Sequence, residues 1–201
     1  YRKMEKLNLL KLAVSRKDTY RIKEEIILPG TKESIGQVLL TDVGSRKLDI
    51  RLGPDEILLR GELQVFCMYL SADEKADWIE QNVPYEGRIS CEGVTEGMYH
   101  HIRHSLEDTL VDVRLDEDGE MRILGIEATL SLRMNIYEEE ENEILRDMYS
   151  LEQVCEFDTR DVVCEELLMQ NQSRCKVSER LALPELKEDV LQILHSQGSI
   201  Q

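Results

Sequence analysis

The stretch MRILGIEATLSLRMNI, residues 121–136, decides the fold class because its apolar residues follow a period of two. From Leu124 onward every even-numbered residue is apolar, and nearly all the residues between them are polar or charged. Successive side chains of a strand point to opposite faces, so this pattern predicts a long strand with one buried face. Met121 and Ile123 have the opposite parity, and this switch beside Gly125 predicts a β-bulge there.

Two hairpins are predicted around such strands. Residues 109–115 alternate in the same way, and Glu117-Asp118-Gly119 separates them from the strand just described, with a glycine suited to a tight turn. Residues 48–52 also alternate, and they are followed by Gly53-Pro54-Asp55 and a strand-like run over 57–70. Towards the end of that run both faces are apolar, which predicts that this strand end is covered on both sides.

One segment carries a helical signal. Glu138–Glu141 would lie in a first helical turn, where negative charge favours the helix dipole. Ile144, Leu145 and Met148 have the spacing of one helix face. The sequence therefore predicts a mainly β protein, an antiparallel β-sandwich with long hairpins and one short acidic helix near 138–148.

An internal repeat predicts the domain organisation. Residues 21–29 (RIKEEIILP) recur without a gap at 176–184 (KVSERLALP), so the chain contains one full copy of a unit and the opening of another. We therefore expect a complete repeat over 1–150, and a connector with the truncated start of a second repeat over 151–201.

A weaker repeat lies inside the first copy. Leu48–Leu52 matches Val111–Leu115, 63 positions later, and each is followed by a turn and a strand. The complete repeat should therefore consist of two similar β units, about 19–80 and 81–150, packed face to face.

The composition of the chain argues against several classes of partner and location. The 201 residues contain 25 Lys and Arg against 41 Asp and Glu, a formal charge of −16, so a nucleic-acid partner is not expected. No apolar run approaches the roughly 20 residues that span a bilayer. The five cysteines (Cys67, Cys91, Cys155, Cys164 and Cys175) show no C-x-x-C spacing, which favours a reducing cytosol. Tyr1 stands where an initiator Met would, so we expect a piece of a longer protein without a signal peptide.

Catalytic and metal-binding signals are weak. His100 and His104 are four residues apart, next to His101, and could bind zinc on a helix. The alternation that begins near Thr109 argues against a helix here, so a surface loop without metal is expected. No nucleophile motif or phosphate-binding loop is present in the sequence, and we expect a protein that is not an enzyme and has no cofactor.

Aromatic residues are the candidate partner-binding positions. Trp78 has the opposite parity to Ile79 and Val83, so it should point outward, where a tryptophan is a plausible contact residue. Capping of the sandwich end is the alternative role for Trp78. Tyr85 and Tyr99 complete the set of candidate partner-binding residues.

An ordered series of short motifs resembles the SPOCS domain family of bacterial spore-formers. The motifs are YRIKEEIILP (20–29), GELQVFCMYL (61–70), WIE (78–80), PYEG (84–87), EGM (96–98), DGE (118–120), YEEE (137–140) and DMYS (147–150). Members of this family carry SPOCS segments in series, often followed by a LysM domain, and the 155-residue repeat fits that layout.

The resemblance implies a scaffold or adaptor role without enzymatic activity. Such proteins act in spore coat assembly in the mother-cell cytoplasm, at the outer surface of the forespore. The implied partner is stage IV sporulation protein A or another coat morphogenetic protein, and a homodimer is possible. Neither a nucleic acid nor a membrane is an expected partner.

Three alternatives remain at this point. The chain could be a cortex or cell-wall polysaccharide-binding module, a spacer between functional domains, or a metal-dependent hydrolase centred on the histidines. The small number of aromatic residues argues against a sugar-stacking platform.

Overall fold

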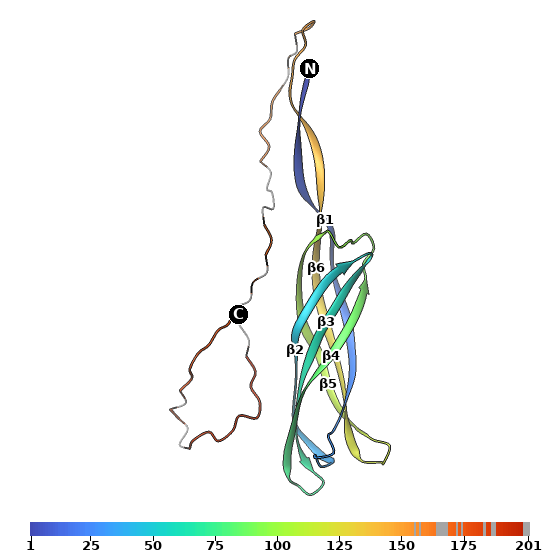
Figure 1. Cartoon of the computed structure of the whole chain (residues 1–201), viewed down its shortest axis with the longest axis vertical. Helices are drawn as coiled ribbons and strands as arrows, with labels where there is room; N and C mark the ends of the chain where they lie inside the picture. Colours follow the sequence, from blue (N-terminus) through green and yellow to red (C-terminus); the bar gives the residue numbers. More distant parts are fainter. Residues whose placement is uncertain are drawn as a thin grey trace.

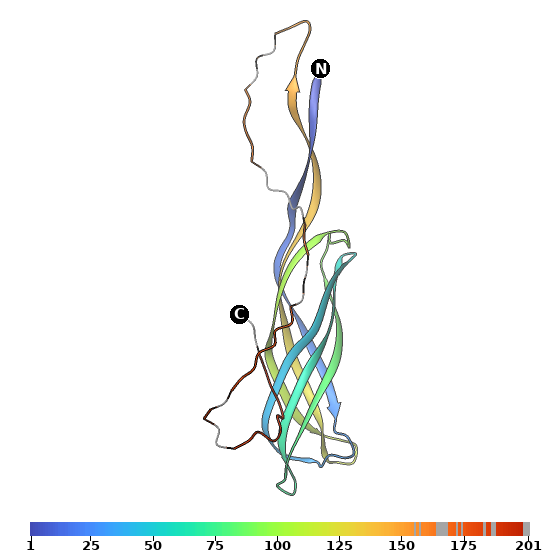
Figure 2. The same cartoon turned by 60° about the vertical axis from the view of Figure 1, so that its left-hand side comes forward.

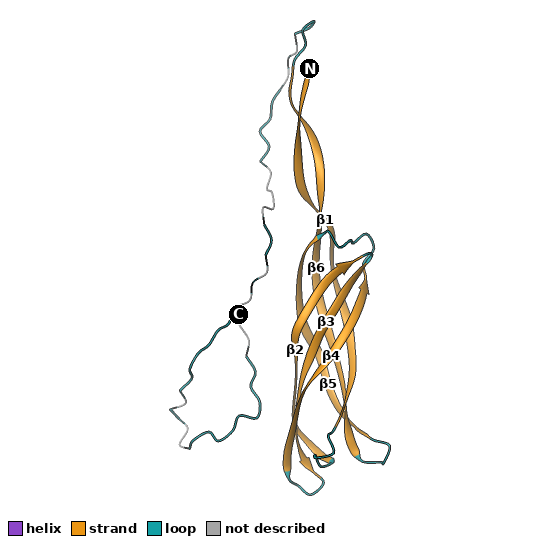
Figure 3. Cartoon of the chain, viewed as in Figure 1, coloured by secondary structure: helices purple, strands orange, loops and turns teal. Residues whose placement is uncertain are grey.

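The computed structural model is built from six strands, and no helix occurs among the residues that it describes (Figure 3). These residues are 1–154, 156, 158–163, 169–171, 173, 175–182, 184–185 and 188–198. The strands are β1 (Arg2–Ile27), β2 (Ile35–Gly53), β3 (Glu56–Ser71), β4 (Ala76–Ser90), β5 (Tyr99–Leu115) and β6 (Met121–Met148).

The strands form two antiparallel sheets, with the orders β1-β6-β5 and β2-β3-β4, which pack face to face (Figures 1 and 2). The predicted antiparallel sandwich is therefore confirmed. Even-numbered residues of β6 from Leu124 to Ile136 are all buried, as their alternation predicts. Burial of one such aliphatic side chain contributes about 1.5–3 kcal/mol. Both predicted hairpin turns are present, between β2 and β3 and between β5 and β6.

The two sheets exchange strands between the similar halves of the repeat. A shift of 63 positions carries Ile26 in β1 onto Ile89 in β4, and it likewise relates β2 to β5 and β3 to β6. However, β1 pairs with β6 and β4 pairs with β3. The first strand of each half therefore completes the sheet that the hairpin of the other half begins.

The irregularity in β6 lies at Arg122 rather than beside Gly125. Leu115 pairs with Met121 and Arg114 pairs with Ile123, so Arg122 is the extra residue, whereas the ladder is regular at Gly125. A Cβ on Gly125 would lie 2.6 Å from the guanidinium carbon of Arg114. The Arg114 side chain thus crosses closely over this glycine, and the predicted bulge position is wrong by three residues.

The predicted acidic helix at 138–148 is wrong, because these residues continue β6 as a strand. Residues 2–11 of β1 pair along them, and β5 begins only at Tyr99, which is opposite Tyr137. Beyond that point β1 and β6 project from the sandwich as a two-stranded ribbon (Figure 1). Cross-strand pairing with the basic strand β1 satisfies the acidic side chains, and it overrides the local helical pattern.

The part of the chain after Met148 that the structure describes forms neither strand nor helix. It contacts the sandwich through Gln170, which donates to the carbonyl of His100 at 2.8 Å, and through His195. Cys155, Cys164 and three residues of the 155-residue repeat, Leu167, Leu183 and Lys187, lie outside the described residues.

Candidate functional site

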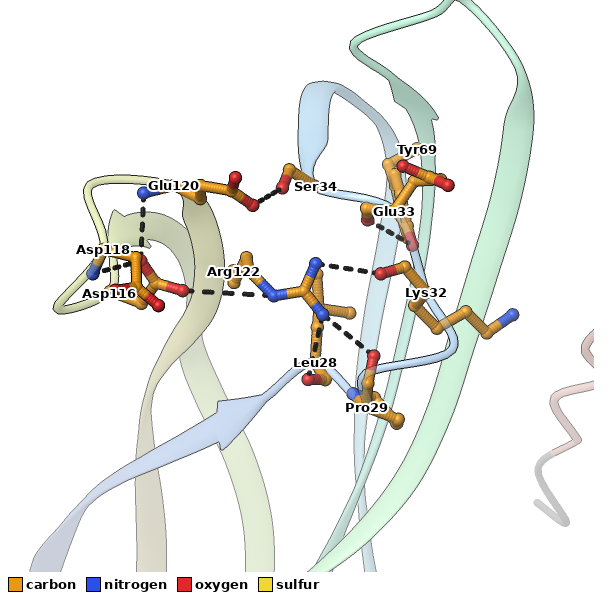
Figure 4. Close-up of polar contacts among 10 residues, drawn as sticks. All are labelled: Leu28, Pro29, Lys32, Glu33, Ser34, Tyr69, Asp116, Asp118, Glu120 and Arg122. Atoms are coloured by element: carbon orange, nitrogen blue, oxygen red, sulfur yellow. Dashed lines mark hydrogen bonds and ion pairs between the residues drawn. The ribbon is translucent and has the colours of Figure 1, made fainter.

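A polar cluster forms where the chain crosses from β1 to β2 (Figure 4). The guanidinium of Arg122 donates from Nη1 to the carbonyl of Lys32 at 2.9 Å and from Nη2 to the carbonyl of Pro29 at 2.9 Å. Its Nη2 also lies 3.4 Å from the carbonyl of Leu28. The Arg122 side chain is 17% exposed. The extra residue of β6 therefore binds three carbonyls of the crossing segment, of which that of Pro29 also accepts from the backbone N–H of Lys32.

The β5–β6 hairpin completes this cluster. Asp116 Oδ1 accepts hydrogen bonds from the backbone N–H groups of Asp118 and Glu120, at 3.0 and 2.9 Å. Ser34 Oγ donates to Glu120 Oε2 at 2.6 Å, which ties the hairpin to the crossing segment. The acidic side chains of this turn accept hydrogen bonds from the backbone of the turn and from the crossing segment. The cluster is therefore a structural clamp between the sheets.

The histidines lie on a strand, so the predicted surface loop is wrong. His100 and His104 lie on one face of β5 and His101 lies on the other. Burial lowers the pKa of His100, and the neighbouring His101 lowers it further. In the part of the chain that the structure describes, no three His, Cys, Asp or Glu side chains gather in a way that could hold a metal ion.

The three candidate partner-binding residues lie in different environments. Tyr85 is buried at 3% exposure against Gly61, and its hydroxyl lies 3.2 Å from that of Ser45. The Tyr99 hydroxyl donates to Glu139 at 3.0 Å, and this hydrogen bond raises the pKa of Tyr99. Trp78 is half-buried on the outer face of the β2–β3–β4 sheet. The structure does not bring these three side chains together, and their partner-binding role stays a prediction.

The outer face of the β2–β3–β4 sheet has an apolar end and a charged end. Its apolar end consists of Leu40, Phe66, Met68 and Trp78, which the ladder places beside one another on three strands. Phe66 is 2% exposed, in agreement with the prediction that this strand end is covered on both sides. We call these four residues the apolar outer patch. Sequence reasoning did not foresee that His195 would be what covers Phe66.

The opposite end of the same face is charged. Arg51, Arg60 and Arg88 line a shallow depression of about 330 Å³ together with acidic neighbours. Arg60 pairs with Glu86 at 3.0 Å and Arg51 pairs with Asp49 at 2.8 Å. Because these cations are already paired and solvent-exposed, the depression does not form a strong anion site.

One comparison with known proteins finds a similarity, and it lies in the central part of the chain. Residues 34–114 match the family model described as SipL, SPOCS domain. The SPOCS match covers β2, β3, β4 and nearly all of β5, so it includes the whole outer face described above. The resemblance that the motifs indicate is thus confirmed for this segment. No curated protein and no solved structure matches the chain.

The SPOCS domain marks a sporulation-related protein family, and this family is not known as enzymatic. Within the described ranges, no helix is long and apolar enough to cross a membrane.

Proposed function

We propose that the chain is a non-enzymatic scaffold or adaptor in bacterial spore coat assembly, which links coat basement-layer proteins at the forespore surface in the mother-cell cytoplasm. The match of residues 34–114 to the SPOCS domain is the observation that carries this proposal. The partner that we propose is stage IV sporulation protein A, with another coat morphogenetic protein as the second choice.

The geometry is consistent with a role in assembly. The sandwich offers a broad sheet face with an apolar end, and the β1–β6 ribbon extends its length (Figure 1). Such faces and edges are the elements through which β modules contact other proteins. The acidic side chains of Glu138 and Glu141 pair with lysines of β1, and Asp116 and Glu120 take part in the clamp at Arg122.

Polysaccharide binding is the second candidate, and the aromatic residues disfavour it. Stacking of sugars needs aromatic rings exposed on one face, yet Phe66, Tyr69 and Tyr85 are buried. Tyr1 and Tyr149, the strongly exposed rings among the described residues, contact each other in a tilted arrangement at the ribbon end, with centroids 5.0 Å apart. A role as a spacer between domains is the third candidate.

Direct binding distinguishes these functions. Residues 1–201 should bind purified stage IV sporulation protein A in interferometry, with an affinity in the micromolar range that is common for transient contacts. They should not sediment with purified cortex peptidoglycan. Sedimentation with peptidoglycan but not with the protein partner would favour the polysaccharide function, and binding to neither would favour the spacer.

Two substitutions test the predicted contact residues. Trp78→Ala and Tyr99→Ala should each weaken binding by about tenfold if the ring lies at the centre of the interface. Arg60→Ala is the matched control, because Arg60 lies on the same outer face as Trp78 but in its charged part. If the control weakens binding as strongly as the two aromatic substitutions, Trp78 and Tyr99 are not specific contacts.

A further inference from the structure

Phe66 is an outward-pointing side chain that is nevertheless buried. Its neighbours Val65 and Cys67 fill the core, so the alternation of β3 places Phe66 on the outer face. Directly opposite Phe66 in the ladder lie Asp42 on β2 and Glu80 on β4. The ring is thus flanked by a carboxylate on each side, and from the sheet itself the Trp78 ring packs beside it.

His195 supplies the cover. Its imidazole stacks on the Phe66 ring with centroids 4.4 Å apart and an angle of 17° between the planes. His195 Nε2 lies 2.7 Å from Asp42 Oδ2 and Nδ1 lies 3.6 Å from Glu80 Oε1. An ionised carboxylate only accepts, so the ring nitrogen is the donor to Asp42. The site therefore matches both the ring plane of His195, through Phe66, and its N–H donor, through Asp42.

The neighbouring side chains hold the site in shape. Trp78 stacks on Phe66 with centroids 6.2 Å apart, and Lys32 Nζ lies 5.4 Å from the centre of the Trp78 ring. Lys32 also pairs with Asp77 at 2.6 Å. The amide of Gln64 donates to Glu80 and fixes that carboxylate. These contacts come from the crossing segment, β3 and β4, so the site is part of the sandwich and does not depend on His195.

We propose that this part of the outer face is a docking site for residues 188–198, which recognise it through His195 and cover it as a removable cap on the same chain. Phe66 offers a flat ring for stacking, and Asp42 beside it offers a hydrogen-bond acceptor. The site therefore favours a segment that presents a planar ring with an N–H donor. Removal of the cap uncovers Phe66 and joins it to Met68 and to Leu40, which is already 54% exposed. Any protein that binds the apolar outer patch through Phe66 must therefore displace the cap.

The tether favours docking within one chain. Roughly 45 residues separate Tyr149, at the end of the ribbon, from His195, and a covalent connection of that length corresponds to an effective concentration on the order of a millimolar. A second copy would have to approach that concentration to compete. Docking should therefore be independent of protein concentration in the micromolar range.

The whole chain contains a single tryptophan, so the fluorescence of Trp78, which packs on Phe66, reports on the surroundings of the site. We would measure acrylamide quenching of Trp78 and the NMR shifts of the His195 ring protons, which stacking on Phe66 should move upfield. His195→Ala should lower the ratio of docked to undocked chains by about tenfold or more, as expected when a hydrogen bond to a charged group is lost. Quenching of Trp78 should increase accordingly, and Asp42→Asn should act in the same direction.

His104→Ala is the matched control, because His104 lies on β5 in the other sheet. It should leave Trp78 quenching unchanged. None of these substitutions lies in the core, and circular dichroism confirms the intact sandwich. Unshifted His195 ring protons in the unmodified chain, or no effect of His195→Ala on Trp78, would overturn the proposal. Docking that strengthens with protein concentration would overturn the assignment to the same chain and indicate a second copy.

Discussion

The guanidinium of Arg122 donates to the carbonyl oxygen of Lys32 across the open end of the sandwich, at 2.9 Å (Figure 4). Arg122 belongs to the β1–β6–β5 sheet, whereas Lys32 lies in the segment that leads into β2. One side chain thus joins the two sheets at the crossing. The same guanidinium also bonds the carbonyl of Pro29.

Arg122→Ala should therefore destabilise the sandwich. The substitution removes the side-chain donor to the carbonyl of Lys32 and one of the two donors to the carbonyl of Pro29, and we expect the free energy of unfolding to fall by about 1–3 kcal/mol. Urea unfolding followed by circular dichroism measures this. Arg122→Lys keeps the charge but not the fork of donors, so it should recover only part of the loss. A loss below about 0.5 kcal/mol for Arg122→Ala, the size typical of surface substitutions, would contradict the clamp.

Glycines under aromatic rings should not tolerate a Cβ. A Cβ on Gly61 would lie 2.6 Å from the Tyr85 hydroxyl, and one on Gly87 would overlap the Tyr20 ring. Tyr20 also donates to the carbonyl of Glu86 at 2.8 Å, so its ring cannot move freely. Gly61→Ala and Gly87→Ala should each lower stability by about 1–3 kcal/mol.

Gly44→Ala is the matched control for these two substitutions. A Cβ at Gly44 has no neighbour within 4 Å, although this glycine also lies in a strand of the β2–β3–β4 sheet. Thermal unfolding should place this variant at or above the unmodified chain, because alanine loses less backbone entropy on folding. If all three alanine variants melted together, the contacts of Tyr20 and Tyr85 would not limit stability.

Charge reversal should loosen the projecting ribbon without unfolding the sandwich. Lys6 pairs with Glu141 at 2.5 Å and Arg146 pairs with Glu5 at 2.9 Å, from opposite strands. Exposed pairs of this kind contribute only about 0.2–1 kcal/mol, so Lys6→Glu should speed amide hydrogen exchange in residues 138–148 by roughly two- to fivefold.

Restoration of the pair provides the test of this cause. Lys6→Glu combined with Glu141→Lys should return the exchange rates of 138–148 to those of the unmodified chain. A gain of helical circular dichroism in Lys6→Glu would show that pairing with β1 is not what keeps these residues extended.

The core should become sensitive to alkaline pH. Burial raises the pKa of the Cys67 thiol from 9.0 to about 11. Burial, followed by the charge of Asp77, raises the pKa of the Tyr69 hydroxyl from 10.0 to about 12. The unfolded chain therefore loses these protons at a lower pH than the folded chain. Their contribution to stability is complete below about pH 9 and declines as the pH rises through 11 to 12.

Thermal unfolding between pH 8 and pH 11 measures this loss. For Cys67, a difference of about two pKa units corresponds to at most roughly 3 kcal/mol. Cys67→Val removes the titrating thiol and should flatten the decline above pH 9. Cys67 in the folded chain should also resist alkylation at pH 8, whereas the exposed Cys175 should react. Equal slopes for Cys67→Val and the unmodified chain would assign the decline to other groups.

The alternation of residues 124–136 could be interpreted without a structure because it records which face of a strand is buried. The turn residues at 53–55 and 117–119 predicted the two hairpins, because a tight turn is specified by the residues within it. Residues 138–148 could not be assigned correctly, because their helical spacing is local while their partner, β1, lies more than a hundred positions earlier. The cover on Phe66 was missed because no local pattern links Phe66 to His195.

By itself, the sequence determined the β class and the two hairpins, since each depends on residues close together in the chain. It also determined the internal similarity between the halves and the SPOCS resemblance, since both are comparisons of sequence with sequence and need no spatial contact. The tertiary structure alone decided that β1 joins β6 and that β4 joins β3. It also decided that the acidic segment is a strand, that Arg122 closes the crossing and that His195 covers the outer face. Those outcomes depend on which distant groups satisfy hydrogen bonds and burial together, and a one-dimensional pattern does not contain that information.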